Sequence, residues 1–158
     1  DTLKDVRQGR NAVVLRTFSK IHGLAGTRVG YGIANKELID VLQRTRQPFN
    51  LNSIAQAGAL AGLLDDEHQA KTKRITDEGR DYLQKQFGEM GLEYIPSYAN
   101  FVLVKVGDGN AVFKAMMDKG VIVRAMAAYK LPEWVRISIG TMPQNERCIE
   151  VMRQVLGK

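Results

Sequence analysis

A short apolar run ends just before a lysine and a glycine-rich turn, and this pattern constrains the fold more than any other part of the chain. Residues 11–16 (N-A-V-V-L-R) are rich in apolar and β-branched side chains, which is typical of a strand buried in a sheet. Lys20 follows the strand, and residues 29–34 (V-G-Y-G-I-A) form a second candidate strand. Because α/β sheets place their chemistry at strand ends, we expect an α/β fold with a functional site around Lys20.

The remaining residues alternate between helical and strand patterns. Helices are expected over residues 36–46 with Asn35 as N-cap, 54–64 after Asn52, 67–90, 111–119 and 145–156. Strands are expected over residues 92–95, 100–106, 121–125 and 134–139. We assign residues 1–66 to a first domain and residues 67–158 to a second, smaller α+β domain, with the boundary inside or just before the long helix.

Charge, hydrophobicity and cysteine content argue against a nucleic-acid partner, a membrane partner and an internal disulfide. The net charge is +6, but lysines and arginines are interleaved with acidic residues along the chain. We therefore expect no nucleic-acid partner, and a nucleic-acid binder stays only as a third hypothesis. No apolar run reaches the roughly 18–20 residues of a membrane span, so we expect no membrane partner and a cytoplasmic location. The single cysteine, Cys148, excludes an internal disulfide and fits a reducing compartment.

The residues around Lys20 supply donors for an anion. Thr17 and Ser19 carry hydroxyls, two glycines expose backbone N–H groups, and Arg28 offers a planar fork for phosphate oxygens. A plain tight turn and a salt bridge are the alternatives for the glycines and for Arg28. A lysine that attacks a carbonyl must be partly neutral, which requires a pKa below the usual value of about 10.4. A lysine of this kind beside a phosphate site suits pyridoxal 5'-phosphate (PLP), although a lone lysine is more often a solvated surface residue.

Several segments carry a resemblance to a known family. Residues 19–31 (S-K-x-x-G-L-x-G-x-R-x-G-Y) closely resemble the PLP-lysine motif of fold-type I aminotransferases. The later matches are P-F-N-L-N-S-I-A-Q (48–56), A-N-F-V-L-V (99–104), G-V-I-V-R (120–124) and V-R-I-S-I-G-T (135–141). This series looks like the histidinol-phosphate aminotransferase family and covers nearly the whole chain. It implies the C-terminal part of the PLP-binding large domain, followed by a smaller α+β domain.

The resemblance also implies roles for residues near the first strand. Lys20 would be the catalytic residue and would bind PLP covalently, and Thr17, Ser19 and Arg28 would hold the cofactor phosphate. We give His22 a packing role, because the lysine itself can move the proton in such a reaction. No cluster of His, Cys and Asp residues has metal-ligand spacing, so we expect no metal.

Two arginines of the second domain are implied to bind substrate. Arg136 would bind the anionic group of the substrate, and Arg124 would assist by gripping the phosphate of histidinol phosphate. Arg136 also stands out by itself, since it alternates with apolar residues in a candidate strand and therefore needs an anion or a buried partner. An exposed arginine on a strand face is the alternative at both positions.

The implied reaction is a PLP-dependent transamination in histidine biosynthesis. L-histidinol phosphate and 2-oxoglutarate would give imidazole acetol phosphate and glutamate, so the partners are a phosphorylated amino substrate and a 2-oxo acid. The whole protein would be a homodimer. A related PLP enzyme, such as a threonine-phosphate decarboxylase, stays as an alternative. A non-catalytic folded module that self-associates is the alternative from a different class.

One element of the family pattern is missing. PLP needs an acid beside its pyridine nitrogen, which in this family lies in a D-x-A-Y segment before the lysine. Only 19 residues precede Lys20, and neither Asp1 nor Asp5 lies in such a motif. The chain also begins without methionine. We therefore expect a piece of a longer protein that is inactive alone, in which the second domain is the better ordered part.

Overall fold

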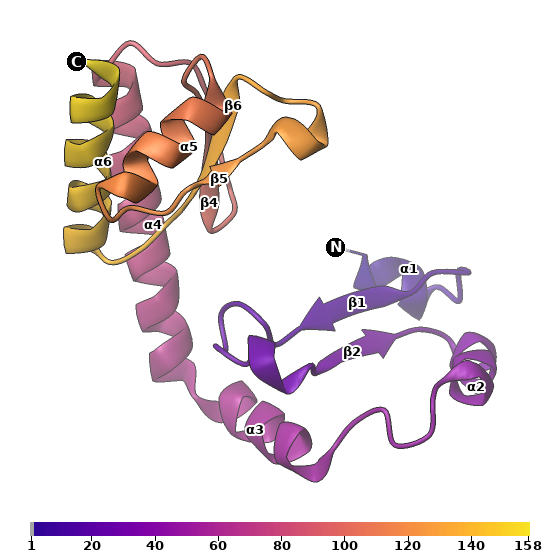
Figure 1. Ribbon diagram of the computed structural model, residues 1–158. Coiled ribbons are helices and arrows are strands. Elements are labelled where there is room, and N and C mark those ends of the chain that lie inside the picture. Colours follow the sequence, from indigo (N-terminus) through magenta and orange to yellow (C-terminus); the bar gives the residue numbers. More distant parts are fainter. Residues whose placement is uncertain (1) are drawn as a thin grey trace. The chain divides into compact units, whose positions relative to one another are not determined.

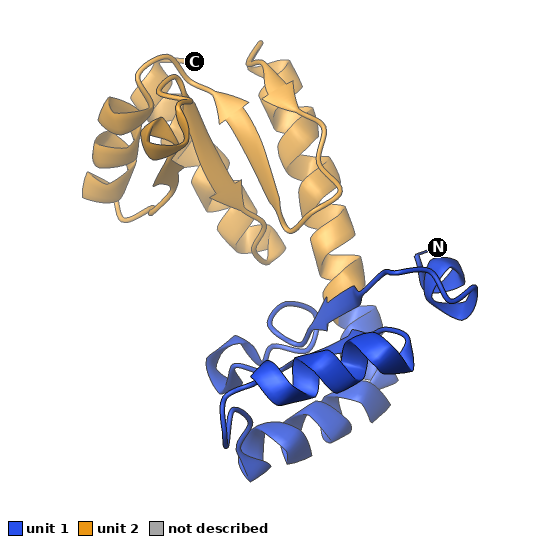
Figure 2. Ribbon diagram, turned by 90° about the vertical axis from the view of Figure 1, so that its right-hand side faces the viewer, with its two compact units in different colours: residues 1–71 blue, residues 72–158 orange. Residues whose placement is uncertain are grey.

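The computed structural model describes residues 2–158 and divides into two compact units (Figures 1 and 2). The first unit extends to Lys71, and the second runs from Thr72 to Lys158. The expectation about Asp1 lies outside the described residues. Among residues 2–158, none of the helices has the length and apolar character that crossing a membrane demands.

The first unit is built around a β-hairpin. Strands β1 (Val14–Thr17) and β2 (Gly30–Ile33) pair antiparallel, and the connection between them contains the short 3-10 helix η1 (Ala25–Thr27). The helices of this unit are α1 (Leu3–Arg7), α2 (Lys36–Thr45) and α3 (Ser53–Leu64).

Helix α2 begins where the sequence predicts, and α3 begins one residue earlier than predicted, directly after its cap Asn52. The Oδ1 atom of Asn35 accepts the N–H of Leu38 at 2.9 Å, and the Oδ1 atom of Asn52 accepts the N–H of Ala55 at 2.8 Å. Each bond satisfies an amide that the first helical turn leaves without a partner.

The core of the first unit is small. It consists of Phe18, Val29, Ala55 and Ala59, with two leucines packed against it. Of the two strands, only Val14 is buried. The expectation of a buried first strand is therefore wrong for the rest of β1, because the sheet has only two strands among the described residues and leaves their faces largely uncovered.

The second unit contains a four-stranded antiparallel sheet. Its strands are β3 (Tyr94–Ile95), β4 (Phe101–Lys105), β5 (Arg124–Ala125) and β6 (Trp134–Ser138), in the order β3-β4-β6-β5. The helices are the long α4 (Asp66–Glu89), which begins in the first unit, α5 (Gly109–Asp118), α6 (Met142–Leu156) and the short 3-10 helix η2 (Ala127–Tyr129).

Helices cover one face of this sheet. Successive residues of a strand point to opposite faces, and in β4 and β6 the buried positions are Val102, Val104, Val135 and Ile137. These valines and the isoleucine pack with buried residues of α4, α5 and α6, which lie together on one side of the strands in Figure 1.

The opposite face of the sheet carries charged side chains together with an aromatic and an aliphatic one. We call it the open face and define it by Phe101, Leu103 and Lys105 of β4, Arg136 of β6 and Arg124 of β5. Directly paired residues of antiparallel strands lie on the same face, so the register places Arg124 beside Arg136 there.

Several element boundaries differ from expectation, and the starts of β5 and α6 show the physical reasons. Strand β5 covers only Arg124–Ala125 instead of residues 121–125, because the N–H of Val121 bonds to the carbonyl of Met116 at 3.0 Å rather than to a strand. Helix α6 begins three residues earlier than expected. There the side chain of Gln144 accepts the N–H of Thr141 at 2.8 Å and completes a capping box.

Candidate functional site

Lys20 lies in the turn directly after strand β1. The N–H of Ser19 donates to Thr17 Oγ1 at 3.1 Å, and the Thr17 hydroxyl donates to Ser19 Oγ at 2.9 Å. The carbonyl of Lys20 accepts the N–H of Gly23 at 2.9 Å, and Gly23 has a φ of 68°, which glycine adopts without steric cost. The local bonds therefore hold two hydroxyls together next to the lysine.

Arg28 returns to the same end of the hairpin. The N–H of Phe18 donates to the carbonyl of Val29 at 3.3 Å, which continues the strand pairing by one residue toward Arg28. Arg28 has a φ of 56°, a left-handed conformation that is uncommon for a residue with a side chain. Its Nη1 atom donates to the carbonyl of Ala25 at 2.7 Å, which fixes the direction of the guanidinium.

The polar groups of this turn are open to solvent. Thr17, Lys20 and Arg28 are exposed, and Ser19 is half-buried. A two-stranded sheet does not enclose the end of its strand, so the described residues do not bury Lys20. Within residues 2–158, neither Lys20 nor Arg28 pairs with a carboxylate, so the salt-bridge alternative for Arg28 finds no support.

His22 packs inside the first unit. Its Nδ1 atom lies 3.1 Å from the carbonyl oxygen of Gly62, and its ring centroid lies 4.9 Å from that of Phe18. These contacts connect the turn after β1 to helix α3. They give His22 a structural role that agrees with the packing interpretation.

Arg124 and Arg136 form a second cluster of positive charge, on the open face of the second unit. The two residues are directly opposed across β5 and β6, where like charges repel each other. Neither forms an ion pair with a carboxylate of the described chain. The Nε atom of Arg136 is buried and lacks a hydrogen-bond acceptor. Because a buried donor normally has a partner, this arrangement can accommodate an external anion.

Two aromatic residues that the sequence did not single out contact these arginines. The Arg136 guanidinium carbon lies 5.2 Å from the ring centroid of Phe101, and that of Arg124 lies 5.4 Å from the ring of Tyr129. Arg124 Nη2 also donates to Tyr129 Oη at 3.1 Å. Phe101 belongs to the A-N-F-V-L-V segment, but its contact with Arg136 depends on strand register, which no local pattern reveals.

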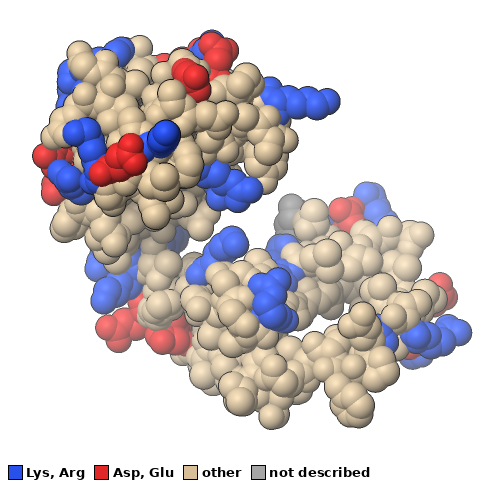
Figure 3. Space-filling view, in the orientation of Figure 1, with Lys and Arg blue, Asp and Glu red and all other residues tan. Residues whose placement is uncertain are grey.

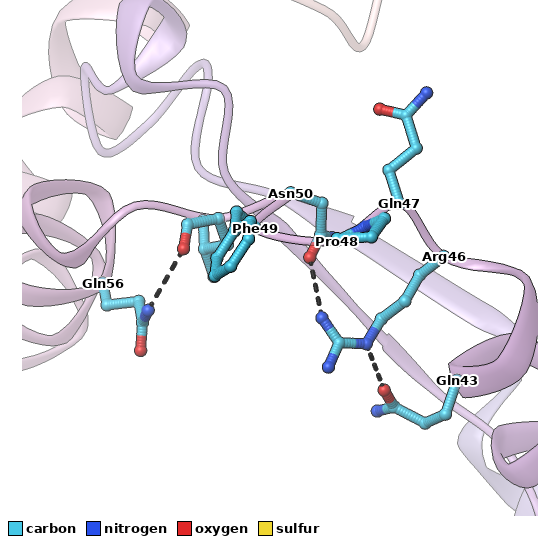
Figure 4. Close-up of a pocket in the computed structure, with 8 residues that line it drawn as sticks. Gln43, Arg46, Gln47, Pro48, Phe49, Asn50 and Gln56 are labelled. Carbon is cyan, nitrogen blue, oxygen red and sulfur yellow. Dashed lines mark hydrogen bonds between the residues drawn. The ribbon is translucent and has the colours of Figure 1, made fainter.

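A separate cavity of about 770 Å³ lies along the loop between α2 and α3 (Figure 4). Arg46 is the only charged residue that lines it, and the other lining residues are Gln43, Gln47, Pro48, Phe49, Asn50, Leu51 and Gln56. The guanidinium of Arg46 donates to Gln43 Oε1 at 2.5 Å and to Asn50 Oδ1 at 3.0 Å. With its one charged group engaged in this way, the cavity supplies no acid or base for chemistry.

Among residues 2–158 the acidic, histidine and cysteine side chains form no metal cluster, and the face in Figure 3 shows no basic block. Among residues 2–158, no group of three or more His, Cys, Asp and Glu side chains is arranged to hold a metal ion. On the face that Figure 3 shows, lysines and arginines are spread over both units and interspersed with acidic side chains. The candidate sites are therefore the hairpin end that carries Lys20 and Arg28, and the pair formed by Arg124 and Arg136.

Comparison with known proteins identifies the class. The family model of aminotransferases of class I and II matches residues 2–152. The chain belongs to this family, and the resemblance and fold class expected from the sequence are confirmed.

Several relatives within this family are named histidinol-phosphate aminotransferases. A histidinol-phosphate aminotransferase of Akkermansia muciniphila is 58% identical over 99% of this chain and 43% of its own length. One from Moorella thermoacetica is 47% identical over 99% of this chain and 41% of its own length. The solved histidinol-phosphate aminotransferase of Sinorhizobium meliloti, in complex with PLP, has a TM-score of 0.80 at 26% identity and covers 93% of this chain and 41% of that one. The chain thus spans less than half the length of these proteins.

Proposed function

We propose that the whole protein is a PLP-dependent aminotransferase that moves an amino group between L-histidinol phosphate and 2-oxoglutarate. The observation that carries the proposal is the end of the hairpin, where Thr17, Ser19 and Lys20 stand at the end of β1 and Arg28 stands just before β2. The two curated relatives, at 58% and 47% identity, support the choice of substrate. The proposal includes a cytoplasmic homodimer that acts in histidine biosynthesis.

The donor set of the hairpin fits two ends of PLP. The hydroxyls of Thr17 and Ser19 and the guanidinium of Arg28 suit a phosphate dianion, and the amine of Lys20 can condense with an aldehyde. When bound, PLP supplies an electron-accepting ring that stabilises negative charge at the carbon bearing the amino group. We assign the acid beside the pyridine nitrogen to no residue of this chain.

Residues of this chain are assigned the proton transfer and the binding of the substrate phosphate. Lys20 Nζ would take the proton from the substrate carbon that bears the amino group and would later give up a proton, so that one group would act as general base and general acid. Arg136 and Arg124 bind the phosphate of the substrate, since two guanidiniums without carboxylate partners match a dianion.

Replacing Lys20 tests the proposal. In the whole protein, at the length of its curated relatives, we expect Lys20→Ala to lower turnover of histidinol phosphate by at least 10²–10⁴-fold, roughly the share of general acid–base catalysis alone. After incubation with PLP, borohydride reduction and digestion, mass spectrometry should find the cofactor on the Lys20 peptide of the unsubstituted protein only. Lys36→Ala, which removes an exposed lysine paired with Asp40, is the matched control and should keep both properties. Full turnover in Lys20→Ala would refute the assignment.

Substrate assays separate the alternatives. A threonine-phosphate decarboxylase would use Lys20, Arg28 and Arg136 in the same way, so we assay the whole protein with histidinol phosphate and with threonine phosphate. Amino transfer to 2-oxoglutarate supports the proposal, whereas release of carbon dioxide from threonine phosphate supports the alternative. A whole protein that takes up no PLP would instead favour the non-catalytic module.

A further inference from the structure

We propose that Tyr129 and Phe101 are positioning residues, which hold Arg124 and Arg136 as a preformed pair that selects a dianion over a monoanion. The inference rests on the proposed function, in which the pair takes the phosphate of the substrate. It assigns a role to two aromatic side chains that contact the arginines, and it leaves both guanidiniums without a carboxylate partner in the described chain.

The backbone alone brings the two arginines together. Arg124 pairs directly with Arg136, and directly opposed residues of antiparallel strands have Cβ atoms only about 4.5–5.5 Å apart. Two long, flexible and like-charged side chains in this position would swing apart in solution. An anion would then have to bring the two guanidiniums back together before both could bind it, which weakens binding.

Each guanidinium instead contacts an aromatic ring. Arg136 lies over Phe101 at 5.2 Å, and Arg124 lies over Tyr129 at 5.4 Å, both within the distance at which a cation is attracted to a ring face. The hydrogen bond from Arg124 Nη2 to Tyr129 Oη, at 3.1 Å, adds a direction to the second contact. The rings therefore restrict the side-chain movement by which the two positively charged guanidiniums would move apart.

The ring of Tyr129 comes from a well-fixed turn. The N–H of Tyr129 donates to the carbonyl of Met126 at 2.9 Å, and the N–H of Leu131 donates to the same carbonyl at 3.3 Å. Met126 is 7% exposed, and its own N–H donates to the carbonyl of Trp134 at 3.1 Å. Because the turn is anchored to β6, Tyr129, which is itself 55% exposed, can restrain the exposed Arg124.

One cation of the open face, unlike the arginine pair, is paired with carboxylates. Lys105, the third cation of the open face, lies 3.7 Å from a carboxylate oxygen of Glu93 and 3.4 Å from one of Glu133. Lys105 is therefore compensated within the chain, whereas the arginine pair is not. A dianion can interact favourably with both guanidiniums at once, and a monoanion supplies half of that charge.

Anion titration of the 158-residue chain tests the inference. Inorganic phosphate, at a pH where it is a dianion, and acetate are added while the side-chain N–H signals of Arg124 and Arg136 are followed by nuclear magnetic resonance. We expect phosphate to bind more tightly than acetate. Tyr129→Leu should weaken phosphate binding about 3- to 10-fold and change acetate binding less than about twofold. It should also increase the mobility of the Arg124 Nε–H group before any anion is added.

Three variants serve as controls. Tyr129→Phe keeps the ring but removes the hydroxyl that accepts from Arg124, so it should weaken phosphate binding less than Tyr129→Leu does. Tyr98→Leu removes a tyrosine of the same unit that is 98% exposed and should change nothing. If Tyr129→Leu loses its folded amide spectrum, Tyr129→Met fills similar space without a ring and should show the same loss of phosphate affinity.

The possible failures are distinguishable. Equal phosphate affinity in Tyr129→Leu and the unsubstituted chain overturns the positioning role and leaves the proposed function intact. If phosphate shifts neither arginine signal in the unsubstituted chain, both the inference and the arginine part of the proposed function fall. The reaction of Lys20 with PLP, followed by borohydride, reports on the remaining part of that function independently.

Discussion

Cys148 is the one thiol of the chain, and its surroundings make it unreactive. It lies on α6 with its side chain in the core of the second unit, where it is 7% exposed. Burial raises the pKa of this thiol from 9.0 to about 11, because the core cannot solvate a thiolate. At neutral pH the group therefore stays protonated, and modification requires the second unit to open.

The Cys148 thiol should make folding stability depend on alkaline pH. Its stabilising contribution is fully present below pH 9, where the unfolded chain also keeps the proton, and is lost as the pH rises toward about 11. In that window the unfolded state binds fewer protons, so the free energy of unfolding falls. Urea unfolding at pH 7 and about pH 10 should show a larger loss for the unsubstituted chain than for Cys148→Ala. Equal losses would contradict a buried, protonated thiol.

At the scale of single residues, the sequence predicts contacts between residues that are close together in the chain. Thr17, Ser19 and Lys20 are neighbours in the chain, and a strand followed by a glycine turn brings them together without help from distant residues. Tyr129 could not be assigned, because its contact depends on where η2 places the ring relative to β5. The exposure of Lys20 was also not predictable, since burial depends on what surrounds the hairpin.

Among the elements, the contact between α4 and the β6–α6 connection depends on Gly79. A Cβ atom at Gly79 would lie 2.5 Å from Asn145 Nδ2 and 2.7 Å from Ile139 Cγ2. Asn145 is 2% exposed, and it accepts the N–H of Gly140 at 2.9 Å and donates to its carbonyl at 3.1 Å. The glycine therefore permits an approach that fixes the start of α6.

Gly79→Ala should destabilise the second unit, although alanine favours helices more than glycine. Moving Asn145 or Ile139 out of the way strains a packed contact, and we expect a loss of about 1–3 kcal/mol in the free energy of unfolding. Gly88→Ala is the matched control in the same helix, since a Cβ there meets no atom within 4 Å. It should gain up to about 1 kcal/mol. Urea unfolding measures both variants, and a gain for both would contradict the close approach.

The starts of α2 and α3 were more predictable than the length of β5. Asn35 and Asn52 cap their helices through bonds that span three residues, so sequence alone identifies them. Strand β5 is shorter than its β-branched pattern indicated, because residues 121–123 make no ladder with β6. A strand exists only where a partner strand offers hydrogen bonds, and that depends on tertiary structure.

On the scale of the whole molecule, the two units differ in how much apolar surface they bury. The first unit has a core of four buried residues, while the core of the second contains fourteen. Helix α3 is almost entirely apolar, yet it leaves Ile54 and Leu64 more than three-quarters exposed, at 78% and 76%. Because apolar burial is the main stabilising contribution, the first unit should open more easily than the second.

Hydrogen exchange of backbone amides tests this difference. We expect amides of β1 and β2 to exchange through openings of lower free energy than amides of β4 and β6. Leu83→Ala, at a fully buried position of α4 in the second unit, should lower the protection of β4 and β6 by about 2–5 kcal/mol, as a core cavity does. If the units open separately, the same variant leaves β1 and β2 unchanged. Equal protection of both sheets, lowered together by Leu83→Ala, would instead show that the 158 residues unfold as one cooperative body.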